Sequence, residues 1–184
     1  MSDGRPQRAD ARRNRDAIVA IARDVFDNDE QVRFDDFAAR AGVGVGTLYR
    51  NFPTREALAV AVYEGEVAAL CDQARDESRS AGDNLDAFLR GFVDYEVAHV
   101  GLARTFAAFV SPAVQADGGI QLESAVDDLL ARAAAEGAIR PEVEVGAVMI
   151  VLHGIGSAID RPLWAAESRM AVELLIAGLK SPAV

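Results

Sequence analysis

Apolar side chains recur every three or four residues along most of this chain, and that spacing limits its possible folds more than any other feature. In the first such segment, Ile18, Ile21, Ala22 and Val25 fall on one face of a helix. The same spacing returns in later segments, and none shows the strict alternation of a half-buried strand. The sequence therefore predicts an all-α protein with about nine helices.

Turn residues and the apolar spacing place these helices along the chain. Residues 1–10 are polar and include Gly4 and Pro6, so we expect a disordered arm there. Gly42 and Gly137 follow apolar helical segments, where glycine commonly ends a helix. The expected helices cover residues 11–27, 34–41, 47–49, 54–75, 84–99, 103–110, 122–133, 145–159 and 170–179.

The distribution of charge separates a short N-terminal part from the rest. The formal net charge is −10, but residues 1–55 hold ten arginines and nine acidic residues, a net of +1. The remainder has nine basic and twenty acidic residues, a net of −11. This distribution suits a small DNA-facing module on an acidic body. A solvated N-terminal tail is the alternative that charge alone leaves open.

Composition also indicates a compartment. Cys71 is the single cysteine and fits a reducing cytosol. The longest apolar stretch, residues 145–159, is short of the roughly 20 residues that a membrane-spanning helix needs. No apolar run follows the first basic residues, as a signal peptide would require. We expect a cytoplasmic protein that does not enter a membrane.

Residues 34–58 form the most informative segment, because they predict a helix, a glycine-marked turn and a short second helix. This is the helix-turn-helix pattern, whose second helix enters the major groove of DNA. Five apolar residues are expected to hold the two helices together, namely Phe37, Ala38, Val43, Leu48 and Phe52. Small residues at 44–46 would let the backbone approach DNA, and residues 47–50 offer hydroxyls and a guanidinium to phosphates or bases.

In these residues the chain resembles the TetR family of bacterial regulators. The resemblance rests on residues 22–26, 38–43, 46–49, 52 and 54–58, and it covers about residues 13–62. It implies phosphate contacts by Thr47, Tyr49 and Arg55. It also implies that the recognition-helix positions are Gly44, Val45, Gly46 and Arg50.

The chain differs from the family pattern at three places. Arg33 stands where the family often has a serine or threonine cap before the second helix, and its side chain could itself reach a phosphate. Asn28 and Asp29 stand where the family usually has glycine after the first helix. Arg55 replaces the family's lysine at the start of the fourth helix, which keeps the charge and adds a bidentate fork.

The resemblance implies a repressor that binds a pseudo-palindromic operator in double-stranded DNA as a homodimer. It also implies that a small apolar or amphipathic ligand releases the repressor from this operator. Residues 11–53 would form the DNA-binding domain and residues 54–184 the ligand-binding and dimerisation domain. The helix at 145–159, where Gly154 and Gly156 permit close approach, and the final helix are the expected dimer contacts, although burial within the chain is an alternative.

The candidate ligand pocket combines aromatic side chains with a few polar groups, which is typical of small-molecule sites. Ordinary core packing is the alternative for each member. Two histidines far apart in sequence give no metal or catalytic pattern, so we expect no cofactor, no metal and no enzymatic activity. The candidates are Phe88, Phe92, Tyr95, His99, Phe106, Phe109, Met149, His153 and Trp164.

Two other functions remain open at this point. The chain could be an all-helical small-molecule-binding protein or enzyme with a vestigial helix-turn-helix. It could also be a protein-interaction module that uses the acidic body. Neither explains the pattern of Thr47, Tyr49 and Arg55.

Overall fold

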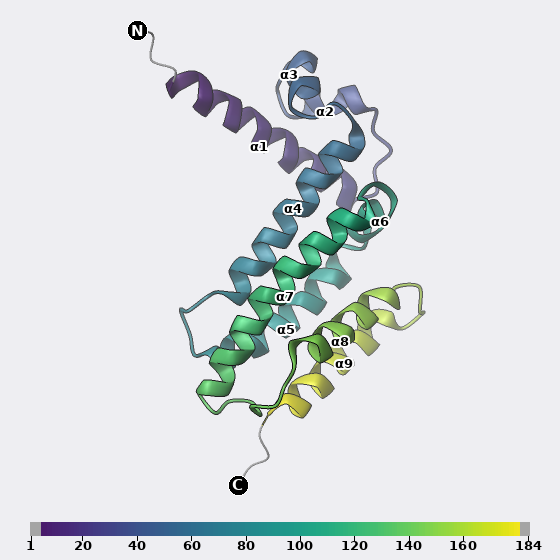
Figure 1. The fold of residues 1–184 in the computed structure, drawn as a ribbon. Helices are drawn as coiled ribbons and strands as arrows, with labels where there is room; N and C mark the ends of the chain where they lie inside the picture. Colours follow the sequence, from purple (N-terminus) through teal and green to yellow (C-terminus); the bar gives the residue numbers. More distant parts are fainter. Residues whose placement is uncertain (1–4, 181–184) are drawn as a thin grey trace. The chain divides into compact units, whose positions relative to one another are not determined.

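The computed structural model describes residues 5–180, and within them it contains nine α-helices and no strand (Figure 1). The all-α prediction is therefore confirmed. The helices are α1 (Arg5–Asp27), α2 (Phe34–Arg40), α3 (Val45–Asn51), α4 (Arg55–Ala74), α5 (Ala81–Ala98), α6 (Val100–Phe109), α7 (Pro112–Ala135), α8 (Val145–Ser157) and α9 (Trp164–Leu179).

Several helix starts differ from the sequence prediction. α1 begins at Arg5, so the described part of the expected disordered arm is helical, whereas residues 1–4 lie outside the described residues. α7 begins at Pro112, ten residues before the expected start at residue 122. Proline is favoured in the first turn, where no intrahelical N–H bond is needed. Pro141 lies in a turn before α8 and does not open that helix.

The first of two compact units comprises Met1–Gly65 and Gly101–Val114. In it α1 packs against α2 and α3, which lie next to each other (Figure 1). This unit also includes α6 from Gly101 onward. Its core contains Ile18, Phe26, Phe37, Leu48 and Phe52, each at most 2% exposed.

A specific turn ends α2 and directs the chain into α3. Gly42 has a φ of +68°. The Val43 amide donates to the Ala38 carbonyl at 2.9 Å, and the Gly42 amide donates to the Ala39 carbonyl at 3.2 Å. These two bonds define a Schellman motif, in which glycine avoids the cost that a Cβ incurs at positive φ.

The second unit comprises Glu66–Val100 and Gln115–Val184. Here α9 packs along α5 and against α8, over a core that includes Leu85, Leu89 and Leu152. Arg90 pairs with Glu173 at 2.5 Å, which adds a link between α5 and α9. Among the described residues, no helix is long and apolar enough to cross a membrane.

Candidate nucleic-acid interface

The turn between α2 and α3 leaves one edge of the recognition helix open. Gly44 and Gly46 are exposed, and a Cβ built on either would meet nothing within 4 Å. Between them Val45 is 46% exposed, which is unusual for a large apolar residue next to a buried core. Backbone and small side chains therefore form this edge, and another molecule can approach it closely.

Tyr49 lies on the same helix with its ring held by α2. The ring meets Phe34 edge-on at a centroid distance of 5.4 Å. The phenol donates a hydrogen bond of 2.8 Å to Asp35 Oδ1, and this bond raises the pKa of Tyr49. The side chain is still 47% exposed. It is thus oriented in advance at the surface, and Asp35 and Phe34 are contributors that the sequence pattern did not single out.

Thr47 and Arg50 are one helical turn apart and joined. Arg50 Nη2 donates to Thr47 Oγ1 at 3.0 Å, and Asn51 Nδ2 donates to the Thr47 carbonyl at 2.8 Å. With Asn14 and Asp10 of α1, these residues line an open pocket of about 420 Å³. The pocket lies between residues 10–14 of α1 and the recognition helix, so α1 borders this surface.

Arg33 and Arg55 occupy different environments. Arg33 precedes α2, is exposed and makes no side-chain cap to that helix. The guanidinium of Arg55 is half-buried, and its Nη1 donates to the Val32 carbonyl at 2.7 Å. Burial lowers the pKa of Arg55. Among the eight predicted DNA-contacting residues, Arg55 is therefore the one whose charged group is directed into the protein.

The predicted ligand-pocket residues are divided between the two units. In the second unit, the Phe88 and Phe92 rings lie 6.3 Å apart, and the Tyr95 and His99 rings 4.6 Å apart. The Tyr95 hydroxyl donates to Glu66 Oε2 at 2.5 Å. Glu66 is a polar neighbour that the aromatic pattern could not reveal.

The other candidates have separate neighbours. Met149 is buried, while His153 is exposed with its Nδ1 at 2.8 Å from the Met149 carbonyl. Trp164 is buried and its indole donates to the Ile155 carbonyl at 2.7 Å. In the first unit, Phe106 meets Tyr63 and Phe109 lies beside Arg55. Packing and hydrogen bonds within the chain account for each of these contacts.

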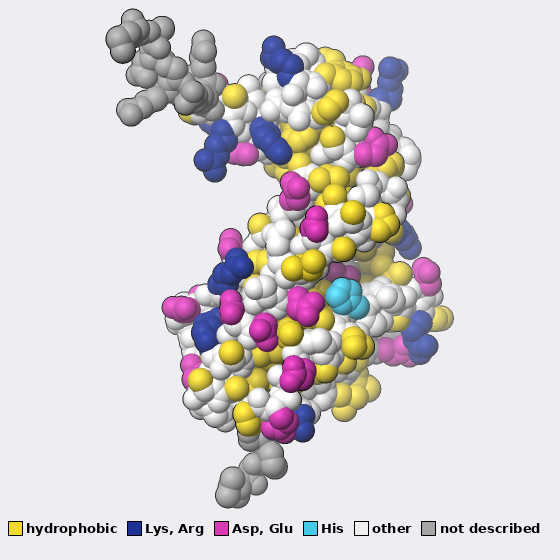
Figure 2. Space-filling view, in the orientation of Figure 1, with side chains coloured by type: hydrophobic (Ala, Val, Ile, Leu, Met, Phe, Trp, Pro, Cys, Tyr) yellow, Lys and Arg dark blue, Asp and Glu magenta, His cyan; other side chains and the backbone are white. Residues whose placement is uncertain are grey.

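Charge follows the same division. In Figure 2, basic side chains stand out on the helices of the first unit, while acidic side chains crowd the visible face of the second. Two exposed arginines of α1, Arg12 and Arg13, pair with acidic residues one turn away. Exposed pairs of this kind leave the guanidinium available because they add little stability. The geometry as a whole defines a helix-turn-helix protein.

Comparisons with known proteins agree with that class. Residues 30–62 match a family model described as bacterial regulatory proteins of the tetR family. Residues 80–181 match the C-terminal domain model of SbtR-like transcriptional regulators. The two models match segments in both units, and the second spans more than half of the chain. The chain therefore belongs to the TetR family of bacterial transcriptional regulators.

Solved structures support the same assignment over nearly the full length. A TetR transcriptional regulator from Streptomyces coelicolor is 37% identical, with a TM-score of 0.73 over 92% of this chain and 99% of its own. A TetR regulatory protein from Mycobacterium vanbaalenii is 31% identical, with a TM-score of 0.76 over 96% of this chain and 100% of its own.

Curated relatives match over shorter stretches. An HTH-type transcriptional regulator from Staphylococcus aureus is 27% identical over 106 residues, which is 55% of this chain and 57% of the relative. A second regulator from that organism is 32% identical over 75 residues, 39% of either chain. The chain thus spans about half the length or less of these two relatives.

Proposed function

We propose that this regulator is a cytoplasmic repressor that binds a pseudo-palindromic operator as a homodimer and leaves it when a small apolar or amphipathic ligand binds. The observation that carries the proposal is the open edge of α3, where Gly44, Val45 and Gly46 lie exposed beside an oriented Tyr49. A recognition helix needs close approach at this end, because its N-terminal residues face the base edges.

The proposed contacts divide by chemistry. Thr47 and Tyr49 carry hydroxyls suited to phosphate oxygens, which position a protein on the duplex. Arg50 has a guanidinium suited to guanine or phosphate, and its bond to Thr47 limits where it can point. Arg33 is exposed ahead of α2, where a phosphate could be reached. Two such modules in a dimer would read half-sites about one helical turn apart.

The first experiment measures binding to DNA from upstream of the protein's own gene, across a salt series. We expect tight binding with a steep negative salt slope, because phosphate contacts release counterions. The double variant Tyr49→Phe/Arg50→Ala should lose roughly tenfold to a hundredfold in affinity, since a base contact by Arg50 is worth about 1–3 kcal/mol. Arg79→Ala removes an arginine from the second unit and serves as the control.

If wild type binds upstream DNA no better than random DNA, a genome-wide selection of bound fragments follows. An empty selection would overturn the DNA-binding proposal. Equal affinities of wild type and the double variant for a selected operator would instead refute the assigned contacts.

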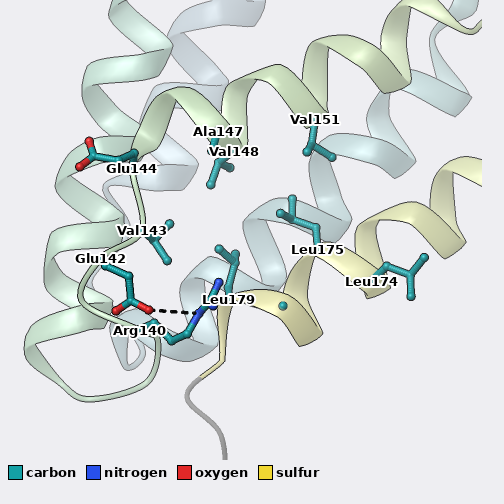
Figure 3. A pocket seen from close by; sticks show the side chains of 11 residues that line it. Arg140, Glu142, Val143, Glu144, Ala147, Val148, Val151, Leu174, Leu175 and Leu179 are labelled. Atoms are coloured by element: carbon teal, nitrogen blue, oxygen red, sulfur yellow. Dashed lines mark ion pairs between the residues drawn. The ribbon is translucent and has the colours of Figure 1, made fainter.

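Exposed apolar side chains on α8 and α9 support the dimer. Ile150 is 74% exposed, Met170 69% and Leu174 70%. Beside Leu174, a pocket of about 400 Å³ opens between the two helices, with Val151 of α8 and Leu175 of α9 facing into it (Figure 3). Exposed apolar side chains on two helices that pack together, with an apolar pocket between them, favour an interface. A second copy of the chain fits it, because a twofold axis places the same projections and hollows opposite each other.

Oligomeric state tests this interface directly. Leu174→Glu should convert a dimer into a monomer by light scattering at micromolar concentration, because it places a charge in an apolar contact. Ile120→Glu is the matched control, since Ile120 is 66% exposed but lies on α7. A dimer that survives Leu174→Glu and Ile150→Glu together would refute the α8–α9 interface.

The ligand site is proposed around Tyr95 of α5 and His99, the residue that follows this helix. Their rings are adjacent, Phe88 and Phe92 lie on the same helix, and Glu66 accepts a hydrogen bond from Tyr95. Apolar rings with a few polar groups suit a small amphipathic molecule. An anilinonaphthalene sulfonate dye provides a probe, and Phe92→Ala should weaken its binding while Ile120→Ala should not. Equal dye binding by both variants would remove this site from the proposal.

A further inference from the structure

The guanidinium of Arg55 lies among three aromatic rings that come from three different helices. Its Cζ is 5.1 Å from the Phe26 ring centre, 5.2 Å from that of Phe37 and 5.8 Å from that of Phe109. These are cation–π distances. The bond from Nη1 to the Val32 carbonyl adds the loop before α2. One side chain of α4 thus joins α1, α2, α6 and that loop.

The start of α6 contacts α1 at a position that only glycine allows. A Cβ on Gly101 would lie within 3.0 Å of the backbone oxygens of Phe26 and Asp27, at the end of α1. Backbone atoms cannot move away from such a contact, whereas the end of a flexible side chain could. α6 is therefore seated directly on the last turn of α1.

Between these two contacts the packing is incomplete. A pocket of about 250 Å³ lies beside Arg55 and Phe109 and is bordered by Thr105 of α6 and by Gln31. Farther along, Phe106 meets the Tyr63 ring of α4 at 5.3 Å. Besides the buried Leu102, α6 is thus attached at separate points, namely the Gly101 contact, the Arg55 cluster and the pair of rings formed by Phe106 and Tyr63.

The chain path gives α6 a special position. All of α6 except its first residue, Val100, belongs to the first unit, but residues 66–99 before it and 115–184 farther along the chain belong to the second. Any displacement of α6 that begins in its flanking segments must therefore act on the attachments to α1, α2 and α4.

We propose that Arg55 is a positioning residue that fastens α6 to the DNA-reading helices and does not itself contact DNA. Its role, which rests on the function proposed above, is to hold α1, α2 and the start of α4 in the arrangement that presents α3. Loosening this attachment would let α6 and the reading helices move independently. The lowered pKa of Arg55 agrees with a guanidinium that has given up part of its hydration to the protein.

The substitution Arg55→Lys distinguishes this positioning role from a direct contact with a DNA phosphate. A lysine at residue 55 keeps a positive charge, so a phosphate contact would survive Arg55→Lys. The ammonium lacks the planar group that stacks on three rings and bonds the Val32 carbonyl in a fixed direction. Arg55→Met keeps much of the apolar stem and removes the charge.

The experiment combines amide hydrogen exchange with the salt dependence of operator binding. In both Arg55→Lys and Arg55→Met, exchange at residues 28–33 and 100–110 should be roughly tenfold faster, as loss of one desolvated cation–π and hydrogen-bonded group implies. The salt slope should equal that of wild type in both. Arg104→Met, which removes an exposed arginine from α6, is the control and should change neither quantity.

Phe109→Leu provides a second route to the same result, because it removes a ring from α6 and leaves Arg55 in place. It should reproduce the faster exchange. Unchanged exchange in Arg55→Met would overturn the proposal whatever happens to DNA binding. A salt slope of operator binding that is smaller by about one in Arg55→Met, but equal to that of wild type in Arg55→Lys, would also overturn the proposal. Arg55 would then contact a phosphate. If wild type binds no operator, the proposed function fails, while exchange still decides whether Arg55 fastens α6.

Discussion

Asp29 adopts a backbone conformation that favours glycine. Its φ is +51°, the Glu30 amide donates to the Val25 carbonyl at 3.0 Å, and the Asp29 amide donates to the Phe26 carbonyl at 3.2 Å. These bonds form a Schellman motif at the end of α1, with Asp29 at the left-handed position. The departure from the family's usual glycine, noted in the sequence, therefore has a conformational cost.

We expect Asp29→Gly to stabilise the protein by about 0.5–1 kcal/mol. Relief of left-handed strain is worth about 1–2 kcal/mol and is partly offset by the greater freedom of glycine in the unfolded chain. Thermal unfolding should show a rise of about 1–4 °C. The neighbouring change Asn28→Gly is the control and should destabilise, because Asn28 Nδ2 donates to the Asp24 carbonyl. Equal effects at the two positions would contradict the strain argument.

A substitution at Gly46 should change stability and operator affinity in opposite directions. Gly46 lies within α3, is exposed, and leaves open space where a Cβ would be. Gly46→Ala should stabilise the helix by up to about 1 kcal/mol, because glycine is a poor helix former. Operator affinity should fall nonetheless, since a methyl group would stand between the backbone and DNA. Gly65→Ala is the control: it offers the same helical gain in α4 and should leave affinity unchanged. Unchanged affinity in Gly46→Ala would remove close backbone approach from the mechanism.

The residues proposed for this surface could be named from the sequence, but their hydrogen-bond and packing partners within the chain could not. Glycine spacing and the exposed polar residues of α3 are local features, so they could be predicted. The bond from Tyr49 to Asp35 joins residues of two helices, and its existence depends on the angle between them. The environment of Arg55 depends on α6, about fifty residues away in sequence, which no local pattern reports.

At the scale of elements, the end of α4 shows how one helix completes another. Asn84 of α5 is 4% exposed, and its Nδ2 lies 3.2, 3.1 and 2.9 Å from the carbonyls of Gln73, Ala74 and Asp76. The last carbonyls of a helix have no intrahelical partner. The Asn84 side chain supplies a hydrogen-bond donor to these carbonyls from a neighbouring helix.

Asn84→Ala should therefore lower the free energy of unfolding by about 2–3 kcal/mol, because it leaves buried carbonyls without a donor. Chemical denaturation gives this value, and hydrogen exchange should show the loss at the end of α4. Gln121→Ala, an exposed amide on α7, should change stability by less than about 0.5 kcal/mol. A cost at Asn84 no larger than that at Gln121 would mean that water replaces the amide.

Helix existence was easier to predict than helix length. The apolar stripe of α7 begins near Leu122, and the structure buries it there, but the helix itself starts at Pro112. Its first two turns are mostly exposed and carry polar residues and glycines, so hydrophobic spacing could not find them. A similar reason applies to α1, whose described part begins six residues before the expected start.

For the whole molecule, the large negative charge makes buried carboxylates costly. Glu96 of α5 is the clearest case. Its Oε2 lies 3.5 Å from where a Cβ on Gly156 of α8 would stand, and burial raises its pKa, while the nearby His153 and His99 act in the opposite direction. A raised acid pKa means that the folded state binds the proton more tightly than the unfolded state. Stability from this group is therefore present at acidic pH and is lost as the pH rises through the folded-state pKa.

Glu96→Gln should consequently stabilise the protein at neutral pH and change little below about pH 4, where the carboxyl is largely protonated in both states. Denaturant unfolding from pH 4 to pH 8 would give the difference as a curve that rises with pH. Glu123→Gln, an exposed position on α7, removes the same charge from the same acidic body and isolates general repulsion. If the two variants gain equally at every pH, the cost belongs to the net charge of −10 and not to the burial of Glu96. A gain confined to Glu96→Gln would show that a charged carboxylate has been retained inside the body at the expense of stability, beside the aromatic residues where we place the ligand.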